Sequence, residues 1–102
     1  MMLSAWYAPD ARQDIYECAE YFESRDSFAV ADRFREAVQK TVEMLCGNSE
    51  LGERFRRDLT GTVRRRGVLG FSNYLIFYRR EDAQLKILRI IHGARDYEQL
   101  FE

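Results

Sequence analysis

The feature that most constrains this chain is the separation of helical and strand periodicity into different halves. Apolar residues recur at three- and four-residue steps in two stretches of the first half, so each set lies on one side of a helix. The polar connection over 24–27, where Asp26 or Ser27 can cap the next helix, predicts an antiparallel helical hairpin that ends at 46–48. The two sets are Ala11, Ile15, Cys18, Ala19 and Phe22, then Val30, Phe34, Val38, Val42 and Leu45.

A proline marks where the first helix begins. The mostly apolar run over 2–7 predicts a strand, and Pro9 is tolerated only in the first turn of a helix, so the helix opens there. Asp10 and Asp14 fall in its early turns, where the helix dipole favours negative charge.

The second half of the chain is rich in strand-forming residues. Residues 74–78 and 85–91 predict two strands joined by a polar hairpin turn over 79–83. Residues 62–69 predict a further strand, which 70–73 separate from the next. Because 85–91 is apolar at nearly every position, it suits a central strand covered on both faces. The order β-α-α-β-β-β predicts an α+β fold, with the helical hairpin on one face of a small, mostly antiparallel sheet.

Length and composition restrict the class of protein further. The 102 residues suffice for one hydrophobic core, so a single domain over 1–102 is expected. There is no apolar run near the ~20 residues of a membrane helix and no basic-then-apolar leader pattern, so a cytoplasmic location is expected. Cys18 and Cys46 match no metal-binding spacing and are interpreted as free, buried thiols.

Charge is distributed unevenly along the chain. Residues 1–53 hold 5 basic and 11 acidic side chains, a net charge of −6, whereas residues 54–102 hold 11 and 6, a net charge of +5. Of the 16 cationic residues 14 are arginine, which can hold carboxylate or phosphate in a planar two-point contact. The pattern indicates an anionic partner, either nucleic acid or an acidic peptide. A merely solvated basic face is the alternative.

Most enzyme classes find no support in the sequence. His92 is the only histidine, so no clustered metal-ligand set exists, and no metal or cofactor is expected. Phosphate-loop, dinucleotide-glycine and Gly-x-Ser-x-Gly motifs are absent. Glu17, Glu20 and Glu23 recur at helical spacing and are read as solvated rather than catalytic.

Arginines are the stronger candidates for a functional site. Arg64 and Arg66 alternate along one predicted strand and so share a face. If the strands pair as expected, several guanidinium groups converge on one side of the sheet, with tyrosines between them, as in surfaces that bind nucleic acid or an acidic peptide. Pairing of these arginines with acids on the helices is the alternative. The candidate binding residues are Arg64, Arg66, Tyr74, Arg79, Arg80, Arg89, Arg95, Asp96 and Tyr97.

The end of the last strand combines several reactive groups. After the apolar run, a turn carries the imidazole of His92, the guanidinium of Arg95, the carboxylate of Asp96 and the phenol of Tyr97. Gly93 permits the bend between strand and turn. Asp96 could cap a short helical turn or take part in binding, and the sequence leaves both roles open.

This segment, His-Gly-Ala-Arg-Asp after an aliphatic strand, resembles the C-terminal signature of ParE toxins in the RelE/ParE superfamily. Other features agree and follow in the right order over nearly the whole chain. They are Ala8-Pro9-x-Ala11 with Asp14-Ile15 at the first helix, Leu51-Gly52 after the second, and Tyr74-Leu75-Ile76-Phe77-Tyr78-Arg79 before the last strand.

The resemblance implies one of two activities. RelE-like members cut messenger RNA on the ribosome with basic residues on the sheet, whereas ParE-like members poison DNA gyrase. Here Leu75 and Val68 stand where many ribonucleases carry basic residues, while Arg66 matches. The departure favours a gyrase-inhibiting ParE toxin with no catalysis of its own. The alternative is a ribosome-dependent ribonuclease that would use Arg66, His92, Arg95 and Tyr97.

The resemblance also implies a partner. ParE toxins are neutralised in a hetero-oligomeric complex by a ParD-like antitoxin, whose acidic amphipathic segment would suit an arginine-lined sheet. Sequence-specific DNA binding is expected of the antitoxin and not of this chain. A toxin fold that has lost its toxicity and only binds antitoxin is a third possibility.

Overall fold

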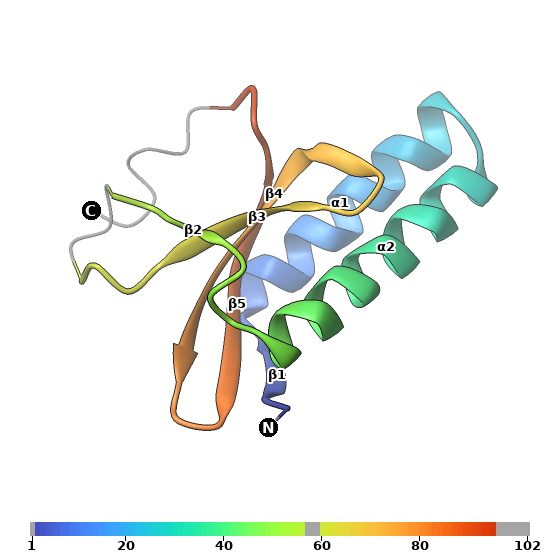
Figure 1. Ribbon diagram of the computed structural model, residues 1–102. Helices are drawn as coiled ribbons and strands as arrows, with labels where there is room; N and C mark the ends of the chain where they lie inside the picture. Colours follow the sequence, from blue (N-terminus) through green and yellow to red (C-terminus); the bar gives the residue numbers. More distant parts are fainter. Residues whose placement is uncertain (1, 57–59, 96–102) are drawn as a thin grey trace.

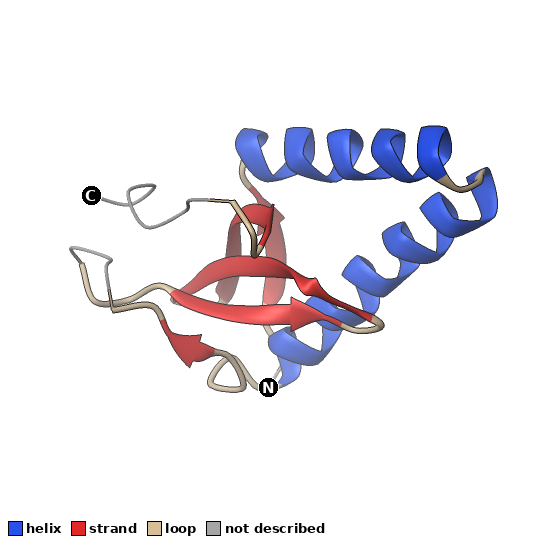
Figure 2. Cartoon of the chain, turned by 90° about the horizontal axis from the view of Figure 1, so that it is seen from above, coloured by secondary structure: helices blue, strands red, loops and turns tan. Residues whose placement is uncertain are grey.

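Two helices pack against one face of a five-stranded sheet in the computed structural model, which describes residues 2–56 and 60–95 (Figure 1). Seen from above, the helices form a V-shaped hairpin beside the sheet (Figure 2). The expected α+β architecture with a helical hairpin on a mostly antiparallel sheet is confirmed.

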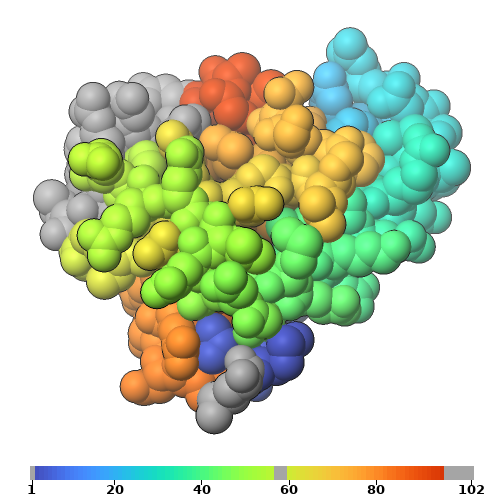
Figure 3. Space-filling view, viewed as in Figure 1, coloured from blue at the N-terminus to red at the C-terminus, as the bar shows by residue number. Residues whose placement is uncertain are grey.

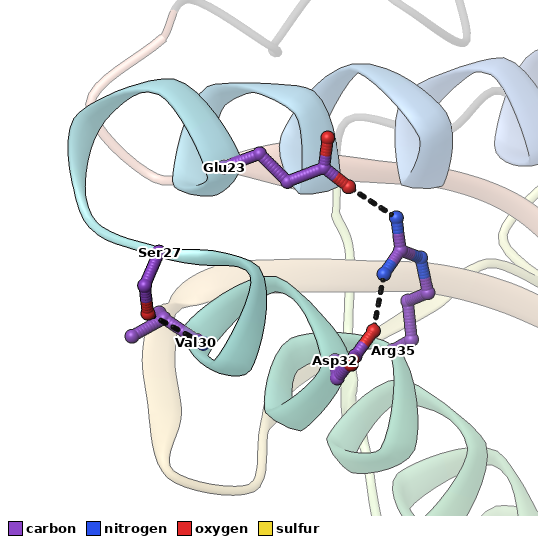
Figure 4. A network of polar contacts seen from close by, with 5 residues as sticks. All are labelled: Glu23, Ser27, Val30, Asp32 and Arg35. Atoms are coloured by element: carbon purple, nitrogen blue, oxygen red, sulfur yellow. Dashed lines mark hydrogen bonds and ion pairs between the residues drawn. The ribbon is translucent and has the colours of Figure 1, made fainter.

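The helical hairpin consists of α1, Pro9–Arg25, and α2, Phe28–Gly47. Ser27 caps α2, because its Oγ accepts a hydrogen bond from the Val30 amide at 3.2 Å (Figure 4). Arg35 of α2 donates to Glu23 of α1 and to Asp32 of its own helix, so one guanidinium ties the two helices together at the surface.

The sheet has the strand order β1-β5-β4-β3-β2. Only β1 and β5 run parallel, and the other pairs are antiparallel. β5 is therefore an interior strand, as its apolar sequence predicts. The strands are β1, Ser4–Tyr7; β2, Glu53–Arg54; β3, Arg64–Val68; β4, Phe71–Glu81; and β5, Gln84–His92.

The core has two parts, one on each face of the sheet. Both helical stripes pack against the helix-side face, where Phe34, Ile76 and Ile87 are fully buried. On the opposite face a smaller cluster joins Phe55, Val63, Phe77 and Ile91. β5 contributes apolar side chains to both clusters, which confirms the sequence-based prediction of a strand covered on both faces.

The strands differ from the sequence-based predictions by one or two residues at several ends and more clearly in β2 and β4. β2 pairs two residues with β3 and was not predicted, because two residues carry no periodicity. β4 begins at Phe71 rather than after Asn73, since Phe71 already packs on Phe34 of α2 with ring centroids 5.3 Å apart. β4 also continues to Glu81, so the hairpin turn is shorter than 79–83 and is made at Asp82 with φ of 52°.

The segment that follows α2 is fixed to the sheet by one tyrosine. The buried Tyr78 hydroxyl donates to the Ser49 carbonyl and accepts from the Gly52 amide, both at 2.8 Å. Gly52 is packed so closely that an added Cβ would overlap the Tyr78 hydroxyl and lie 2.8 Å from the Arg65 carbonyl oxygen. Residues 49–52 therefore form a firm cover over one end of the helix-side face.

Candidate functional site

Most of the predicted site residues that the structure describes fall into two groups at different ends of the sheet. One group lies beside α1, where β4 and β5 project past the end of β1, and the other lies around the segment after α2. Two predicted residues, Asp96 and Tyr97, lie outside the described residues.

A cavity of about 350 Å³ opens between α1 and the end of the β4–β5 pair; we call it the α1 cavity. Its wall is mixed, because aromatic and aliphatic side chains alternate with charged ones. It is lined by Asp14, Glu17, Cys18, Tyr21, Tyr74, Ile90, Ile91, His92 and Arg95.

A buried carboxylate closes the inner side of the α1 cavity. Asp14 accepts from Arg89 Nε at 2.8 Å and Nη2 at 3.0 Å, and also from the Ile90 amide at 2.9 Å. The two side chains are 7% and 22% exposed, so water screens the pair poorly. The hydrogen bond to Asp14 raises the pKa of the Arg89 guanidinium. Arg89 is thus engaged inside the fold, and the early-turn role predicted for Asp14 gives way to this ion pair.

His92 is held in one tautomer at the mouth of the cavity. Its Nδ1 accepts from the Ala94 amide at 3.0 Å, so the proton of the neutral ring lies on Nε2. The ring packs edge-on against Tyr74, with centroids 4.9 Å apart. Gly93 makes the bend after the strand, as predicted, and its amide donates to the Asn73 carbonyl at 2.6 Å.

The thiol and phenol in this cavity are poor nucleophiles at neutral pH. Burial, aided by the charges of Asp14 and Glu17, raises the pKa of Cys18 to about 11, against a smaller lowering effect of Arg95. Burial likewise raises the pKa of Tyr74. Both cysteines are free, as predicted, although only Cys46 is fully buried.

The second group lines a hollow of about 250 Å³, which we call the arginine pocket. Arg64 and Arg80 belong to the predicted set, and Arg54 joins them from β2. Arg64 is oriented by the carbonyls of Gly52 at 2.8 Å and Glu50 at 3.4 Å. The remaining lining residues are Ser49, Glu50, Gly61, Thr62 and Tyr78.

The other predicted arginines lie apart from both hollows. Arg66 shares the face of Arg64, as predicted, and donates to the Leu51 carbonyl at 2.9 Å. Arg79 alternates to the opposite face, where its Nη2 pairs with Glu81 at 2.8 Å. The expected convergence on one side of the sheet is therefore correct for Arg64, Arg66 and Arg80 and wrong for Arg79 and Arg89.

Sequence reasoning missed two residues that the structure makes prominent. Asp14 lies between Ala11 and Cys18 on the apolar stripe of α1, and a carboxylate on such a stripe was a readable sign of a buried partner. Arg54 gave no comparable sign, because β2 is too short to show a pattern.

Within residues 2–56 and 60–95, no group of three or more His, Cys, Asp or Glu side chains is arranged to hold a metal ion. In the same part of the chain, no helix has both the length and the apolar character that crossing a bilayer requires.

Fold and composition define a class: small α+β proteins with a helical hairpin on one face of a mostly antiparallel sheet. A solved chain from the chromosomal ParDE toxin–antitoxin system of P. aeruginosa has this fold. It matches with a TM-score of 0.69 and 17% identity over 89% of this chain and 96% of that one. The model of the ParE toxin family, toxins of the type II toxin–antitoxin system parDE, matches residues 6–97, so the chain belongs to that family. No curated protein matches the chain significantly.

Proposed function

We propose that this ParE toxin inhibits DNA gyrase by binding it, without cutting a nucleic acid itself, and that a ParD-like antitoxin neutralises it. The observation that carries the proposal is the composition of the α1 cavity, where the groups a ribonuclease would use are mixed with carboxylates and apolar side chains.

The α1 cavity suits a protein segment better than a scissile phosphate. Tyr21 and Tyr74 offer apolar contact, and Arg95 offers a cation for an acidic side chain of a partner. Glu17 and Asp14 line the same wall, and their negative charge opposes a phosphate, although Arg89 offsets that of Asp14. An acidic amphipathic antitoxin segment would use the apolar wall and place its charge toward Arg95.

The cationic groups of the ribonuclease alternative are not brought together among the described residues. His92 and Arg95 share the α1 cavity, but Arg66 is hydrogen-bonded to Leu51 beside the segment that follows α2. Charge stabilisation of a phosphoryl transition state requires donors aimed at the same oxygen atoms. The separation of Arg66 from the other two supports binding rather than bond cleavage.

The test compares the two activities of purified toxin in parallel. Gyrase supercoiling of relaxed plasmid should be blocked and cleaved plasmid should accumulate, while messenger RNA on translating ribosomes stays intact. Adding the antitoxin from the neighbouring reading frame should restore supercoiling.

Arg95→Ala is the informative variant and Arg12→Ala, on the exposed surface of α1, is its matched control. Loss of gyrase inhibition or antitoxin binding in the first alone would locate the contact at the α1 cavity. Intact supercoiling together with cut messenger RNA would contradict the proposal, and Arg95→Ala would then slow cleavage by about 10²-fold if that residue is catalytic.

A further inference from the structure

The arginine pocket contains an arrangement that folding alone does not favour. Arg54 of β2 and Arg64 of β3 are directly paired in register. Side chains in such a pair have Cβ atoms roughly 5 Å apart, and like charges there are destabilising. Arg80 follows two residues after Tyr78, the β4 partner of Arg64, so it lies on the same face at the diagonal position.

Within residues 2–56 and 60–95, these three guanidinium groups, of Arg54, Arg64 and Arg80, have no acidic side chain as an ion-pair partner. The next residue on β3 is different, because Arg65 Nε pairs with Glu53 at 2.6 Å on the opposite face. Glu50 adds one carboxylate, so the three guanidinium groups and one carboxylate among the described lining residues sum to a net charge of +2.

The floor of the arginine pocket is held in place by hydrogen bonds. Tyr78 is fully buried beneath it with both hydroxyl hydrogen bonds made, and the Gly52 carbonyl orients Arg64 at 2.8 Å. Arg54 and Arg80 are exposed above this floor. Figure 3 shows this face, with the lime-green segment after α2 between yellow β3 and the orange β4–β5 hairpin. Arg80 Nε donates to the Asp82 carbonyl at 3.0 Å, which leaves its terminal nitrogen atoms for a ligand. A ligand would therefore meet two guanidinium groups oriented by backbone carbonyls and the exposed guanidinium of Arg54.

We propose that the arginine pocket binds a backbone phosphate of nucleic acid. A single carboxylate needs fewer hydrogen-bond donors than three guanidinium groups supply. Asp14 shows this, because one guanidinium and one backbone amide satisfy both of its oxygen atoms. A phosphodiester presents oxygen atoms on several sides and suits three guanidinium groups that line one hollow.

A phosphate contact of this kind carries no sequence information. It adds affinity for any nucleic-acid strand that the target holds against the toxin. The inference goes beyond the proposed function and does not depend on whether gyrase is the target.

The experiment measures fluorescence anisotropy of labelled probes with the full 102-residue chain at several salt concentrations. The probes are a 20-base-pair mixed-sequence DNA duplex and a single-stranded RNA of equal length, with a poly-glutamate peptide as a third. The test variant is Arg54→Gln/Arg80→Gln, which removes two exposed guanidinium groups and should not disturb folding. The matched control is Arg12→Gln/Arg33→Gln, which removes the same charge from exposed positions on the helices.

The wild type and the control should bind at least one nucleic acid. The test variant should bind about tenfold more weakly, and its plot of log affinity against log salt should be flatter by about 1 to 2. The preferred nucleic acid identifies whether the phosphate comes from duplex or single strand. Arg54→Gln alone should give an intermediate loss, which guards against an effect of misfolding in the double variant.

Three results would overturn the inference. They are no binding of either nucleic acid by the wild type at low salt, equal weakening in test and control variants, and binding of poly-glutamate alone. The last result would assign the pocket to an acidic peptide.

Discussion

Arginine has opposite roles at the two ends of this sheet. Beside α1, Arg89 makes a two-point contact through Nε and Nη2 with the buried carboxylate of Asp14, which ties β5 to α1. Around the segment after α2, Arg54, Arg64 and Arg80 gather without a carboxylate partner among the described residues. An arginine-rich β half therefore does not by itself define a binding surface. Arginines that already pair with a carboxylate of the fold have to be separated from those that do not, and only the second kind are candidates for binding a partner.

The largest effect is expected from breaking the pair beside α1. Asp14→Ala leaves the Arg89 guanidinium and the Ile90 amide without their acceptor, and should lower the free energy of unfolding by about 3 kcal/mol. Urea denaturation followed by circular dichroism measures this. The control, Glu23→Ala, removes a carboxylate from Arg35 on the surface, where that guanidinium is 44% exposed, and should change stability far less. Equal losses in the two variants would remove the distinction between structural and surface arginines.

A second prediction concerns the low reactivity of the Cys18 thiol in the α1 cavity. Burial raises the pKa of Cys18 from 9.0 to about 11, so its thiolate fraction at pH 8 is lower by roughly 100-fold than that of an unperturbed thiol. Alkylation by iodoacetamide should be slow and should accelerate about tenfold per pH unit up to about pH 11. Mass spectrometry of the Cys18 peptide measures the rate, with the same peptide in urea as the control. A rate that levels off below pH 9 would contradict the raised pKa.

The third prediction disturbs the other end of the sheet. In Gly52→Ala the new methyl group overlaps the Tyr78 hydroxyl and crowds the Arg65 carbonyl, which should destabilise the protein by about 2 kcal/mol. Thermal or urea unfolding checks the change. Gly47→Ala is the control, because its Cβ would meet only the Met2 sulfur at 3.4 Å and it lies in a helix, where alanine is favoured. Wild-type stability of Gly52→Ala would show that residues 49–52 pack loosely against Tyr78.

The smallest expected effect concerns the floor of the arginine pocket. Tyr78→Phe removes the hydroxyl from between the Ser49 carbonyl and the Gly52 amide, and should cost about 1 kcal/mol. Tyr16→Phe, at a side chain that is 63% exposed, should cost nothing measurable. If phosphate binding weakens in Tyr78→Phe while the fold persists, the firm floor contributes to the pocket. Unchanged binding would assign the whole effect to the arginines.

Sequence periodicity was sufficient for the elements that bury a stripe. Both helices and the interior position of β5 follow from apolar spacing, and local capping chemistry narrowed the cap of α2 to Asp26 or Ser27, of which the structure uses Ser27. Elements whose positions depend on contacts with distant parts of the chain were harder to predict from the sequence. β2 exists only because β3 lies beside it, and the start of β4 at Phe71 depends on the ring of Phe34 in α2.

The sequence predicted which residues belong to the candidate sites better than it predicted which of them lie together. The sequence identified Arg64, Arg80, Arg89 and Arg95 as candidates, but their neighbours are set by register and by α1. Whether an arginine meets an acid 75 residues earlier in the chain, as Arg89 meets Asp14, is decided by tertiary packing and not by spacing. A carboxylate on the apolar stripe of α1 was the one available clue.

The position of Asp14 also limits how other chains can join this sheet. β1 ends at Tyr7, so among the described residues the next stretch of β5 has no neighbouring strand on that side. The Ile90 amide there would otherwise be open to an incoming peptide, but the Asp14 carboxylate already occupies it at 2.9 Å. A strand from another chain could pair with β5 at this point only if it displaced α1. That displacement would leave the Arg89 guanidinium without its carboxylate partner.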